Sequence, residues 1–450
     1  MKKKGYYFIG IGGIRMSALA GYLKAQGFDI WGSDMSSSET IHQLQDHGIH
    51  VFIGHDKKNV TTILSKCTIV KAVKSYAIPP KHIEEIELQE QGIDVLFDAQ
   101  FIGGLTKKYK TIGIAGTSGK TTTTGIASKL LIDSKYDPHI IIGSKAKFLQ
   151  NKGYRVGGNN SLFILEADEY KDAFLNYHFE YLLLPSITYD HPDYFKTKYQ
   201  YWESFAKAIL NTQKTVIADI KQTNFSNIWQ IAKKLAKETQ KPLPTLIDWR
   251  KNLEKVKHFK LYINTQFLQE DSAVVYTLGK QLCIPATQTQ QSLESYKGVW
   301  RRFEHKKDIK TNNHQISIYS DYAHNPEKLK FCLQALYDSF KKHNFIIFFQ
   351  PHQYARTKAF FDSFVKVLQN NIRKNTTLFI MDIYKSRDKL EDIRAVNSQM
   401  LVSKINRDNV RYSGDTTNTR QILKTTIQNC KTQTLILIIG AGNIEDILKD

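Results

Sequence analysis

Short apolar runs that end in glycine or in polar residues recur along this 450-residue chain, and stretches with apolar residues at helical spacing follow several of them. The runs predict strands within the segments 6–13, 28–34, 111–114, 161–170 and 181–195. The helical spacing predicts helices at 15–27 and at 121–131. Strands that alternate with helices in this way indicate an α/β fold.

The second half of the chain repeats this alternation. Further strands are predicted to begin near residues 315, 344, 376 and 434, and short α/β units occupy 66–78 and 92–104. Between residues 213 and 290 the sequence is lysine-rich, and we expect irregular structure that carries little chemistry. The length predicts two to four domains, because a single core rarely grows beyond 250–300 residues.

The segment GTSGKT at 116–121 joins a predicted buried strand to a predicted helix. Such a turn points backbone N–H groups and the positive end of a helix dipole at one place, where a polyphosphate binds well. Lys120 would add a charge at the outer phosphates, and the Thr121 hydroxyl would face a bridging magnesium ion. The general phosphate-loop pattern has its first glycine where this chain has Ile114, so a purely structural turn is the alternative.

The N-terminal segment forms a second glycine turn. Gly10, Gly12 and Gly13 end the first strand, and Asp34 ends the second. This βαβ arrangement lets a carboxylate reach ribose hydroxyls while the turn faces a diphosphate. Arg15 stands at the third glycine position of the pattern, so a plain turn remains possible from these residues alone.

Two more predicted strands carry polar residues at their carboxyl ends. Glu166 ends the first of them, and Asp190 and His191 follow the second. Ligands of open α/β sheets bind at this edge, so Glu166 and His191 could face the same magnesium ion as Thr121. A helix-capping carboxylate and a loop histidine are the structural alternatives.

Composition restricts the class of protein. The net charge of +20 is compatible with nucleic acid or an anionic substrate, but the lysines are spread along the whole chain, as AT-rich codon usage would also produce. No apolar run approaches the roughly 20 residues of a membrane span. Four scattered cysteines indicate a reducing cytoplasm. The opening MKKKGYYFIGIGGI imitates a signal peptide, although Arg15 and the glycines favour the βαβ interpretation.

Motifs in a fixed order complete the pattern: FIGIGGIRMSALA, GTSGKTTTT, EADEY, DHPDYF, GVWRRFE, DYAHNP, FQPHQYARTK, DIYKSRD and GAGNI. On these motifs, the chain resembles the Mur ligases over almost its whole length. The resemblance implies three domains: a Rossmann-like UDP-sugar-binding domain at 1–104, a central P-loop ATPase-like domain at 105–303, and a Rossmann-like domain for the amino acid and ATP at 304–450.

The resemblance also implies an activity. The expected reaction is the ATP- and Mg²⁺-dependent joining of L-alanine to UDP-N-acetylmuramate through an acyl phosphate, in the synthesis of peptidoglycan precursors. We expect a cytoplasmic monomer or homodimer without a membrane or nucleic-acid partner. The implied residues are Lys120, Glu166, His191 and Arg302 for catalysis; Gly116, Thr117, Ser118, Gly119, Lys120, Thr121, Thr122 and Asp321 for ATP; Gly10, Gly12, Gly13, Asp34 and Ser75 for the UDP-sugar; His352 and Arg356 for the amino acid; and Thr121, Glu166 and His191 for the metal.

The chain departs from the family pattern at Arg15, at Asn325, at Gln353 and in FLQED at 267–271, which stands where relatives contact adenine. An ionised Asp271 only accepts hydrogen bonds, so we expect weaker ATP binding and poor discrimination against GTP. Two alternatives to the main expectation are a sister ligase that attaches a peptide, and a degenerate nucleotide-binding or nucleic-acid-binding protein of this fold.

Overall fold

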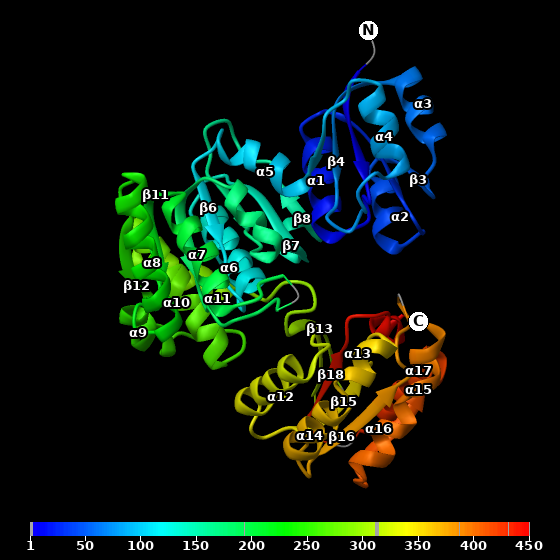
Figure 1. Ribbon diagram of the computed structural model, residues 1–450. Helices are drawn as coiled ribbons and strands as arrows, with labels where there is room; N and C mark the ends of the chain where they lie inside the picture. Colours follow the sequence, from blue (N-terminus) through cyan, green and yellow to red (C-terminus); the bar gives the residue numbers. More distant parts are fainter. Residues whose placement is uncertain (1–2, 193, 311–314, 387, 431, 450) are drawn as a thin grey trace. The chain divides into compact units, whose positions relative to one another are not determined.

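The computed structural model describes residues 3–192, 194–310, 315–386, 388–430 and 432–449 (Figure 1). The chain divides into two compact units: residues 1–261 with 267–296, and residues 262–266 with 297–450. In the described ranges the strands form three sheets, of which two lie in the first unit and one in the second. Helices and strands alternate throughout, so the predicted α/β class is confirmed.

The first sheet is parallel, with the order β3-β2-β1-β4-β5. Its strands are β1 (Lys4–Ile9), β2 (Asp29–Asp34), β3 (His50–Ile53), β4 (Thr68–Lys74) and β5 (Val95–Phe97). Its helices are α1 (Ile14–Ala25), α2 (Glu39–Asp46), α3 (Lys57–Lys66), α4 (Ile83–Glu90) and α5 (Asp98–Thr106). The strand order reverses between β1 and β4, and ligands of such sheets bind at the carboxyl ends of the strands beside this switch point.

The second sheet has the order β12-β11-β10-β6-β9-β7-β8, and β8 is its antiparallel edge strand. Its strands are β6 (Thr111–Ile114), β7 (His139–Ala146), β8 (Lys152–Arg155), β9 (Phe163–Glu166), β10 (Phe179–Leu184), β11 (Thr212–Ala218) and β12 (Thr245–Asp248). Its helical segments are α6 (Lys120–Asp133), η1 (Lys147–Leu149), η2 (Tyr170–Asn176), α7 (Lys198–Leu210), α8 (Thr223–Thr239), η3 (Trp249–Asn252), α9 (Leu253–Lys257), α10 (Gln266–Gln281) and α11 (Ala286–Ser295).

The segment 213–290 is regular, so the expectation of irregular structure was wrong. It contributes β12 and most of β11 to the sheet, as well as helices such as α8. In α8 the buried residues Phe225, Ile228, Ala232 and Ala236 recur every three or four positions, and lysines fill exposed positions between them. The high lysine content concealed this amphipathic helix.

Helix α1 joins the first two sheets into one unit. It packs against β7 and β8, where Gly21 leaves room for the ring of Tyr154: a Cβ at Gly21 would lie 2.2 Å from that ring. The Tyr22 hydroxyl is 3.0 Å from His139 Nδ1 across the same contact. Buried apolar residues of both sheets therefore belong to one continuous core.

The third sheet has the order β13-β14-β18-β15-β16-β17, and only the β13–β14 pair is antiparallel among its described strands. Its strands are β13 (Glu304–Lys310), β14 (Gln315–Asp321), β15 (Asn344–Phe349), β16 (Thr376–Met381), β17 (Val410–Gly414) and β18 (Thr434–Ile439). Its helical segments are α12 (Pro326–Ser339), α13 (Tyr354–Ala359), α14 (Phe361–Asn371), α15 (Leu390–Ala395), α16 (Ser398–Ile405), α17 (Thr416–Asn429) and η4 (Ile444–Leu448).

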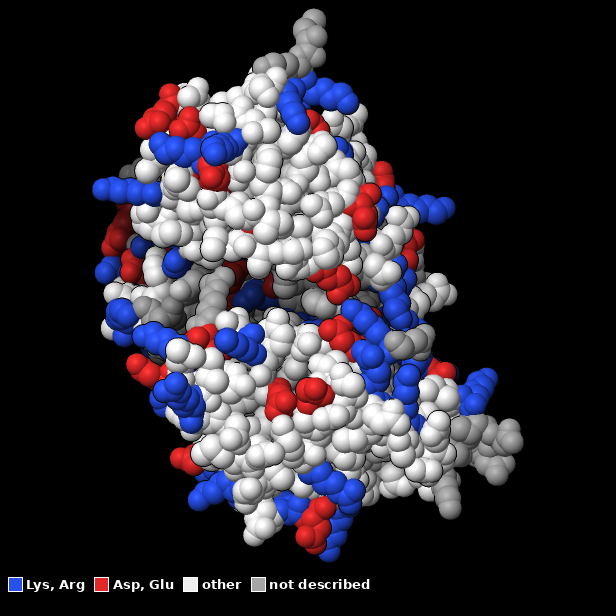
Figure 2. Space-filling view, turned by 90° about the vertical axis from the view of Figure 1, so that its right-hand side faces the viewer, with Lys and Arg blue, Asp and Glu red and all other residues white. Residues whose placement is uncertain are grey.

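Each of the three predicted domains holds one sheet, whereas the boundaries at 104/105 and 303/304 stay predictions. None of the helices in the described ranges has the length and apolarity that a membrane span requires. Figure 2 shows one face of the molecule, on which basic and acidic side chains are interspersed. The net positive charge is therefore not gathered into one continuous patch on this face.

Candidate active site

The phosphate loop lies between β6 and α6, in the middle of the second sheet. Gly116 and Gly119 have φ values of +132° and +84°, which favour glycine. A Cβ at Gly116 would lie 2.5 Å from the Ser186 carbonyl oxygen, and a Cβ at Gly119 would lie 2.4 Å from Asp271 Oδ1, so neither glycine has room for a side chain. The Thr117 hydroxyl donates to the Thr188 carbonyl oxygen at 2.5 Å and fixes the loop against the segment that follows β10.

Lys120 begins α6 and is held in place by two acceptors. Its Nζ donates to the Gly116 carbonyl oxygen at 2.6 Å and to Glu169 Oε2 at 2.8 Å. Burial acts to lower the pKa of Lys120, but Glu169, Asp168 and Glu166 outweigh burial and raise it. The lysine therefore stays protonated and supplies a fixed positive charge at the mouth of the loop.

Thr121 and Glu166 lie together, as the strand register requires. Ile114 pairs with Glu166 across β6 and β9, so the carboxylate reaches the start of α6. The Thr121 hydroxyl donates to Glu166 Oε1 at 3.0 Å, and the Gly143 N–H donates to Oε2 at 3.1 Å. Two of the three predicted metal ligands, Thr121 and Glu166, thus lie beside the phosphate loop.

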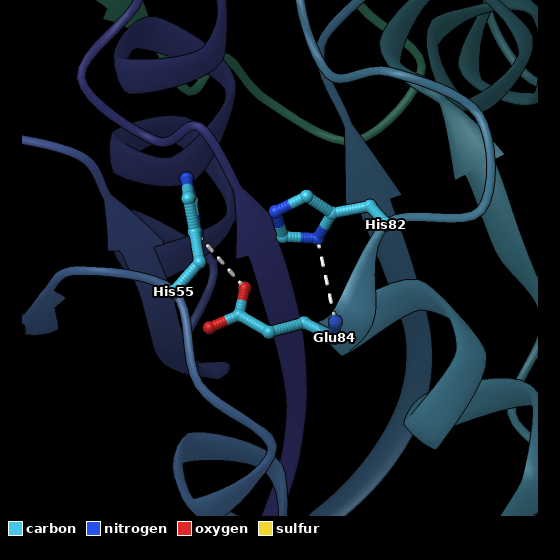
Figure 3. Close-up of side chains that lie close together, drawn as sticks. All are labelled: His55, His82 and Glu84. Atoms are coloured by element: carbon cyan, nitrogen blue, oxygen red, sulfur yellow. Dashed lines mark hydrogen bonds and ion pairs between the residues drawn. The ribbon is translucent and has the colours of Figure 1, made fainter.

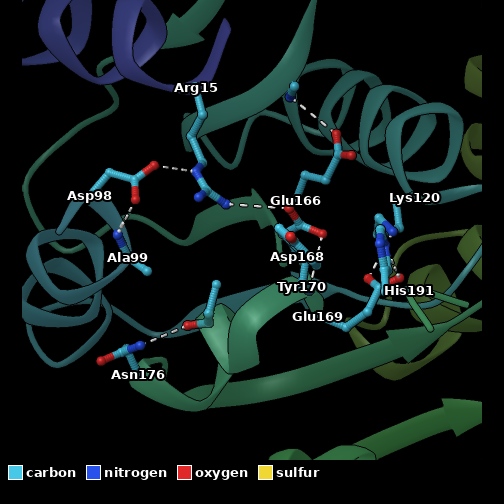
Figure 4. A network of polar contacts seen from close by, with 12 residues as sticks. Arg15, Asp98, Ala99, Lys120, Glu166, Asp168, Glu169, Tyr170, Asn176 and His191 are labelled. Carbon is cyan, nitrogen blue, oxygen red and sulfur yellow. Dashed lines mark hydrogen bonds and ion pairs between the residues drawn. The ribbon is translucent and has the colours of Figure 1, made fainter. Parts of the chain in front are cut away.

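His191 lies beside Glu169 rather than beside Glu166. Its Nε2 is 3.8 Å from Glu169 Oε1, and its φ of +56° is unusual for a residue with a side chain. Among the described residues Glu169 Oε1 is buried and accepts no hydrogen bond, which is costly for a carboxylate unless a cation approaches it. Potential ligand atoms of Asp168, Glu169 and His191 lie within 4.8 Å of one another, so these residues fit a divalent cation (Figure 4).

No prediction from the sequence named Glu169 or Asp168 as a site residue. The available signal was the run EADE, which places three carboxylates at the end of one strand. Burial of Glu169 raises the pKa of its carboxyl group, although Lys120 acts in the opposite direction. Glu169 therefore contacts Lys120 and also belongs to the candidate metal site.

The proposed UDP-sugar residues meet at the switch point of the first sheet. Gly10 has a φ of +77°, and the Gly12 N–H donates to Asp34 Oδ2 at 2.8 Å. A Cβ at Gly10 would lie 3.5 Å from the Ser75 Cβ, which places Ser75 on the same turn. Gly13 is the N-cap of α1, so the helix begins directly at the turn. The arrangement suits a diphosphate at the turn with its ribose near Asp34.

Asp271 lies in α10 behind the phosphate loop. Its Oδ1 accepts a hydrogen bond from Thr123 Oγ1 at 3.0 Å and would lie 2.4 Å from a Cβ at Gly119. Burial raises the pKa of Asp271 to about 8, so the group is mostly protonated at neutral pH. The expectation of an ionised carboxylate was therefore wrong. A neutral carboxyl group offers one donor and one acceptor, as an amide does, and the reason for expecting poor discrimination against GTP falls away.

The remaining predicted residues lie in the second unit. Asp321 ends β14 and accepts hydrogen bonds from the Phe303 N–H at 2.9 Å and the Ala323 N–H at 2.8 Å. The Arg302 guanidinium lies 5.5 Å from the centre of the Tyr322 ring. Arg301, its neighbour, is buried and donates to the Gly442 carbonyl oxygen, so Arg301 has a structural role.

His352 and Arg356, the residues predicted to hold the amino acid, lie together after β15. Arg356 Nη1 is 3.3 Å from His352 Nδ1, and the His352 ring stacks on Tyr384. Burial lowers the pKa of His352, so the ring tends to be neutral. His324 was not among the predicted site residues; its ring centre lies 6.2 Å from that of His352, and burial lowers its pKa to about 4. His324 is the histidine of the motif DYAHNP, which was the available sequence signal for it.

A second cluster of possible metal ligands lies beside the first sheet, where His55 follows β3 and where His82 and Glu84 stand at the start of α4 (Figure 3). Glu84 Oε1 accepts hydrogen bonds from Asn59 and from the Asp56 N–H, and Oε2 contacts Ser33 Oγ and His55 Nδ1. All four acceptor positions of this carboxylate are therefore occupied, and we assign the cluster a structural role.

Comparisons with known proteins agree with this fold. Residues 5–110 match the Mur ligase family, catalytic domain; residues 114–282 match the Mur ligase middle domain; and residues 301–442 match the Mur ligase, glutamate ligase domain. Together with near full-length relatives at 30% to 33% identity, these matches show that the chain belongs to the Mur ligase family, and it is a ligase.

Among the relatives is a UDP-N-acetylmuramate--L-alanine ligase of Clostridium botulinum (strain Okra / Type B1), which is 32% identical over 98% of this chain and 96% of its own length. The solved structure of UDP-N-acetylmuramate-alanine ligase MurC from Thermotoga maritima has a TM-score of 0.76 at 19% identity and covers 98% of this chain and 97% of its own. A folylpolyglutamate synthase/dihydrofolate synthase from Yersinia pestis, solved with AMPPNP and a Mn ion, has a TM-score of 0.52 at 13% identity and covers 78% of this chain and 91% of its own. These two structures share the fold.

Proposed function

We propose that the protein joins L-alanine to UDP-N-acetylmuramate at the expense of ATP, in the synthesis of peptidoglycan precursors in the cytoplasm. The observation that carries this proposal is Lys120, a partly buried cation directly after a glycine-rich loop, together with the carboxylates of Glu166 and Glu169 beside it. This arrangement suits the triphosphate of ATP and a magnesium ion. Full-length relatives named as L-alanine ligases favour alanine over a peptide as the second substrate.

In the first chemical step, the lactyl carboxylate oxygen of UDP-N-acetylmuramate attacks the γ-phosphorus of ATP. The bond to the β,γ-bridging oxygen breaks, and ADP leaves. Lys120 stabilises the negative charge on the β- and γ-phosphates, and the N–H groups at the start of α6 add further donors. Magnesium would be held by Thr121 and Glu166 on one side of the loop and by His191 with Glu169 on the other, and would neutralise phosphate charge.

In the second step, the alanine amine attacks the acyl phosphate carbon. A tetrahedral intermediate forms, it expels phosphate, and the nitrogen loses a proton. His352 and Arg356 would hold the amino acid, because an arginine grips a carboxylate with two parallel hydrogen bonds. Arg302 would stabilise the transferred phosphoryl group, and Asp321 would contact ATP.

Phosphate release from ATP tests the proposal. The purified chain is assayed with UDP-N-acetylmuramate and a panel of L-alanine, glycine, L-serine, D-glutamate and the tripeptide L-Ala-γ-D-Glu-meso-diaminopimelate. We expect release that needs both the sugar nucleotide and L-alanine, with the highest kcat/KM for alanine. A higher kcat/KM for the tripeptide would identify a peptide ligase instead. Absence of release with every amine would refute ligase activity of this type.

A further inference from the structure

Arg15 lies between the glycine turn of the first sheet and the segment 166–169 at the end of β9 in the second sheet, which we call the catalytic loop. It is the second residue of α1, directly after the turn that we assign to the UDP diphosphate. Figure 4 shows its side chain extending from α1 toward Asp98 and Asp168. Asp168 lies next in sequence to Glu169, which holds Lys120. The guanidinium thus lies between the two places where the sugar nucleotide and ATP would carry their phosphates.

One edge of the guanidinium is fixed by the protein. Nε donates to Asp98 Oδ2 at 2.6 Å, and the Asp98 side chain is only 4% exposed. Asp98 Oδ1 in turn accepts from the Ala99 N–H at 2.8 Å, so the carboxylate itself cannot rotate freely. Because Nε is directed at Asp98, the two terminal nitrogens, Nη1 and Nη2, face the catalytic loop.

The terminal nitrogens have capacity for a ligand. Nη1 is 3.8 Å from Asp168 Oδ2, which is an ion pair but too long for a hydrogen bond. Among the described residues, no acceptor forms a hydrogen bond with Nη1 or Nη2 of Arg15, and the side chain keeps 24% of its exposure. A guanidinium held in this way presents two parallel N–H groups, whose geometry matches a carboxylate.

We propose that Arg15 binds the lactyl carboxylate of UDP-N-acetylmuramate and holds it beside Asp168 for attack on ATP. This inference rests on the proposed function, because it takes the sugar nucleotide to be bound at the glycine turn. With UDP at that turn, the carboxylate at the other end of the substrate extends toward the Lys120 loop, and Arg15 points along this direction. The diphosphate is the less suitable ligand, because the guanidinium extends away from the turn.

Two sugar nucleotides that differ in the lactyl group alone provide the test. UDP-N-acetylglucosamine lacks the lactyl ether of UDP-N-acetylmuramate and is otherwise the same molecule. Calorimetric titration of both ligands into the wild-type chain and into Arg15→Gln and Arg15→Lys measures the affinity ratio. Lys24→Gln is the matched control, since Lys24 is a cation in the last turn of the same helix.

We expect Arg15→Gln to weaken UDP-N-acetylmuramate about 10- to 100-fold, the equivalent of one hydrogen-bonded charge, and to change UDP-N-acetylglucosamine less than threefold. Arg15→Lys keeps the charge but loses the two parallel N–H groups. The ratio of its affinities for the two sugar nucleotides should therefore lie between those of the wild type and the glutamine variant. Lys24→Gln should leave both affinities unchanged.

Arg15→Gln could also disturb the buried Asp98. If that variant loses both ligands, Arg15→Lys decides the question, and an unchanged ratio there overturns the inference. An equal loss for both ligands in Arg15→Lys assigns the residue to the diphosphate and also overturns it. A wild-type chain that binds neither sugar nucleotide refutes the proposed function itself, which distinguishes the two failures.

Discussion

Asp271 should make the stability of the first compact unit depend on pH in an unusual direction. Its carboxyl group is buried behind the phosphate loop. Among the described residues this carboxyl group has one hydrogen bond, which it accepts from the Thr123 hydroxyl. Burial raises its pKa from 3.8 to about 8. Between these two values the folded chain keeps a proton that the unfolded chain has lost. The free energy of unfolding therefore falls as pH rises through this window, and it stops falling above about pH 8.

The magnitude follows from the size of the shift. Each pKa unit corresponds to about 1.4 kcal/mol, so the full cost of Asp271 at alkaline pH is on the order of 5 kcal/mol. Between pH 5 and pH 7 the cost grows by about 2.5 kcal/mol. Asp271→Asn has nearly the same shape and no titrating proton. The variant should therefore be more stable than the wild type, by a margin about 2.5 kcal/mol larger at pH 7 than at pH 5.

Urea unfolding of both proteins at pH 5, 6, 7 and 8 measures this margin. Tryptophan fluorescence reports mainly on the first unit, which contains Trp31, Trp202, Trp229 and Trp249. Asp46→Asn makes the same substitution at an exposed position of α2 and should show a margin that does not change with pH. A constant margin for Asp271→Asn would show that this carboxyl group is ionised in the folded protein.

Further predictions concern the phosphate loop and the two ligand sites. Glu166→Gln and His191→Ala should each lower kcat at least about 100-fold and raise the Mg²⁺ concentration needed for half-maximal activity; near-normal turnover in both would exclude them from the metal site. Asp34→Ala should weaken UDP-N-acetylmuramate about 10- to 100-fold while ATP affinity, measured by titration, stays within threefold. A parallel loss of ATP affinity would contradict this separation. Gly119→Ala should destabilise the chain by about 2 kcal/mol or more, because its φ is left-handed and the new Cβ meets Asp271; urea unfolding at wild-type stability would show that the loop relaxes.

The sequence predicts the parts of this structure that depend on local signals. Apolar runs that end in glycine or carboxylates marked β1, β6 and β9, and the glycines of the phosphate loop take the left-handed φ values that such a turn needs. Glu166 could be placed beside Thr121 because parallel strands bring their carboxyl ends to one edge of the sheet.

Contacts between distant residues could not be predicted in this way. Arg15 was recognised as a departure from a glycine pattern, but its partners Asp98 and Asp168 come from other parts of the fold. The protonated state of Asp271 depends on its burial on α10 beside Thr123 of α6, which no local pattern encodes. Glu169 was missed because its role arises only when the chain brings it against Lys120.

The transfer of a labelled oxygen tests the central claim most directly. UDP-N-acetylmuramate with ¹⁸O in its lactyl carboxylate is incubated with ATP, L-alanine and the wild-type chain, and the released phosphate is analysed by mass spectrometry. Attack of the carboxylate on the γ-phosphorus, followed by displacement by the amine, leaves one carboxylate oxygen in the phosphate. We predict one ¹⁸O atom in each phosphate released and an equal amount of the amide product. Unlabelled phosphate would show that water, and not the substrate carboxylate, attacks ATP.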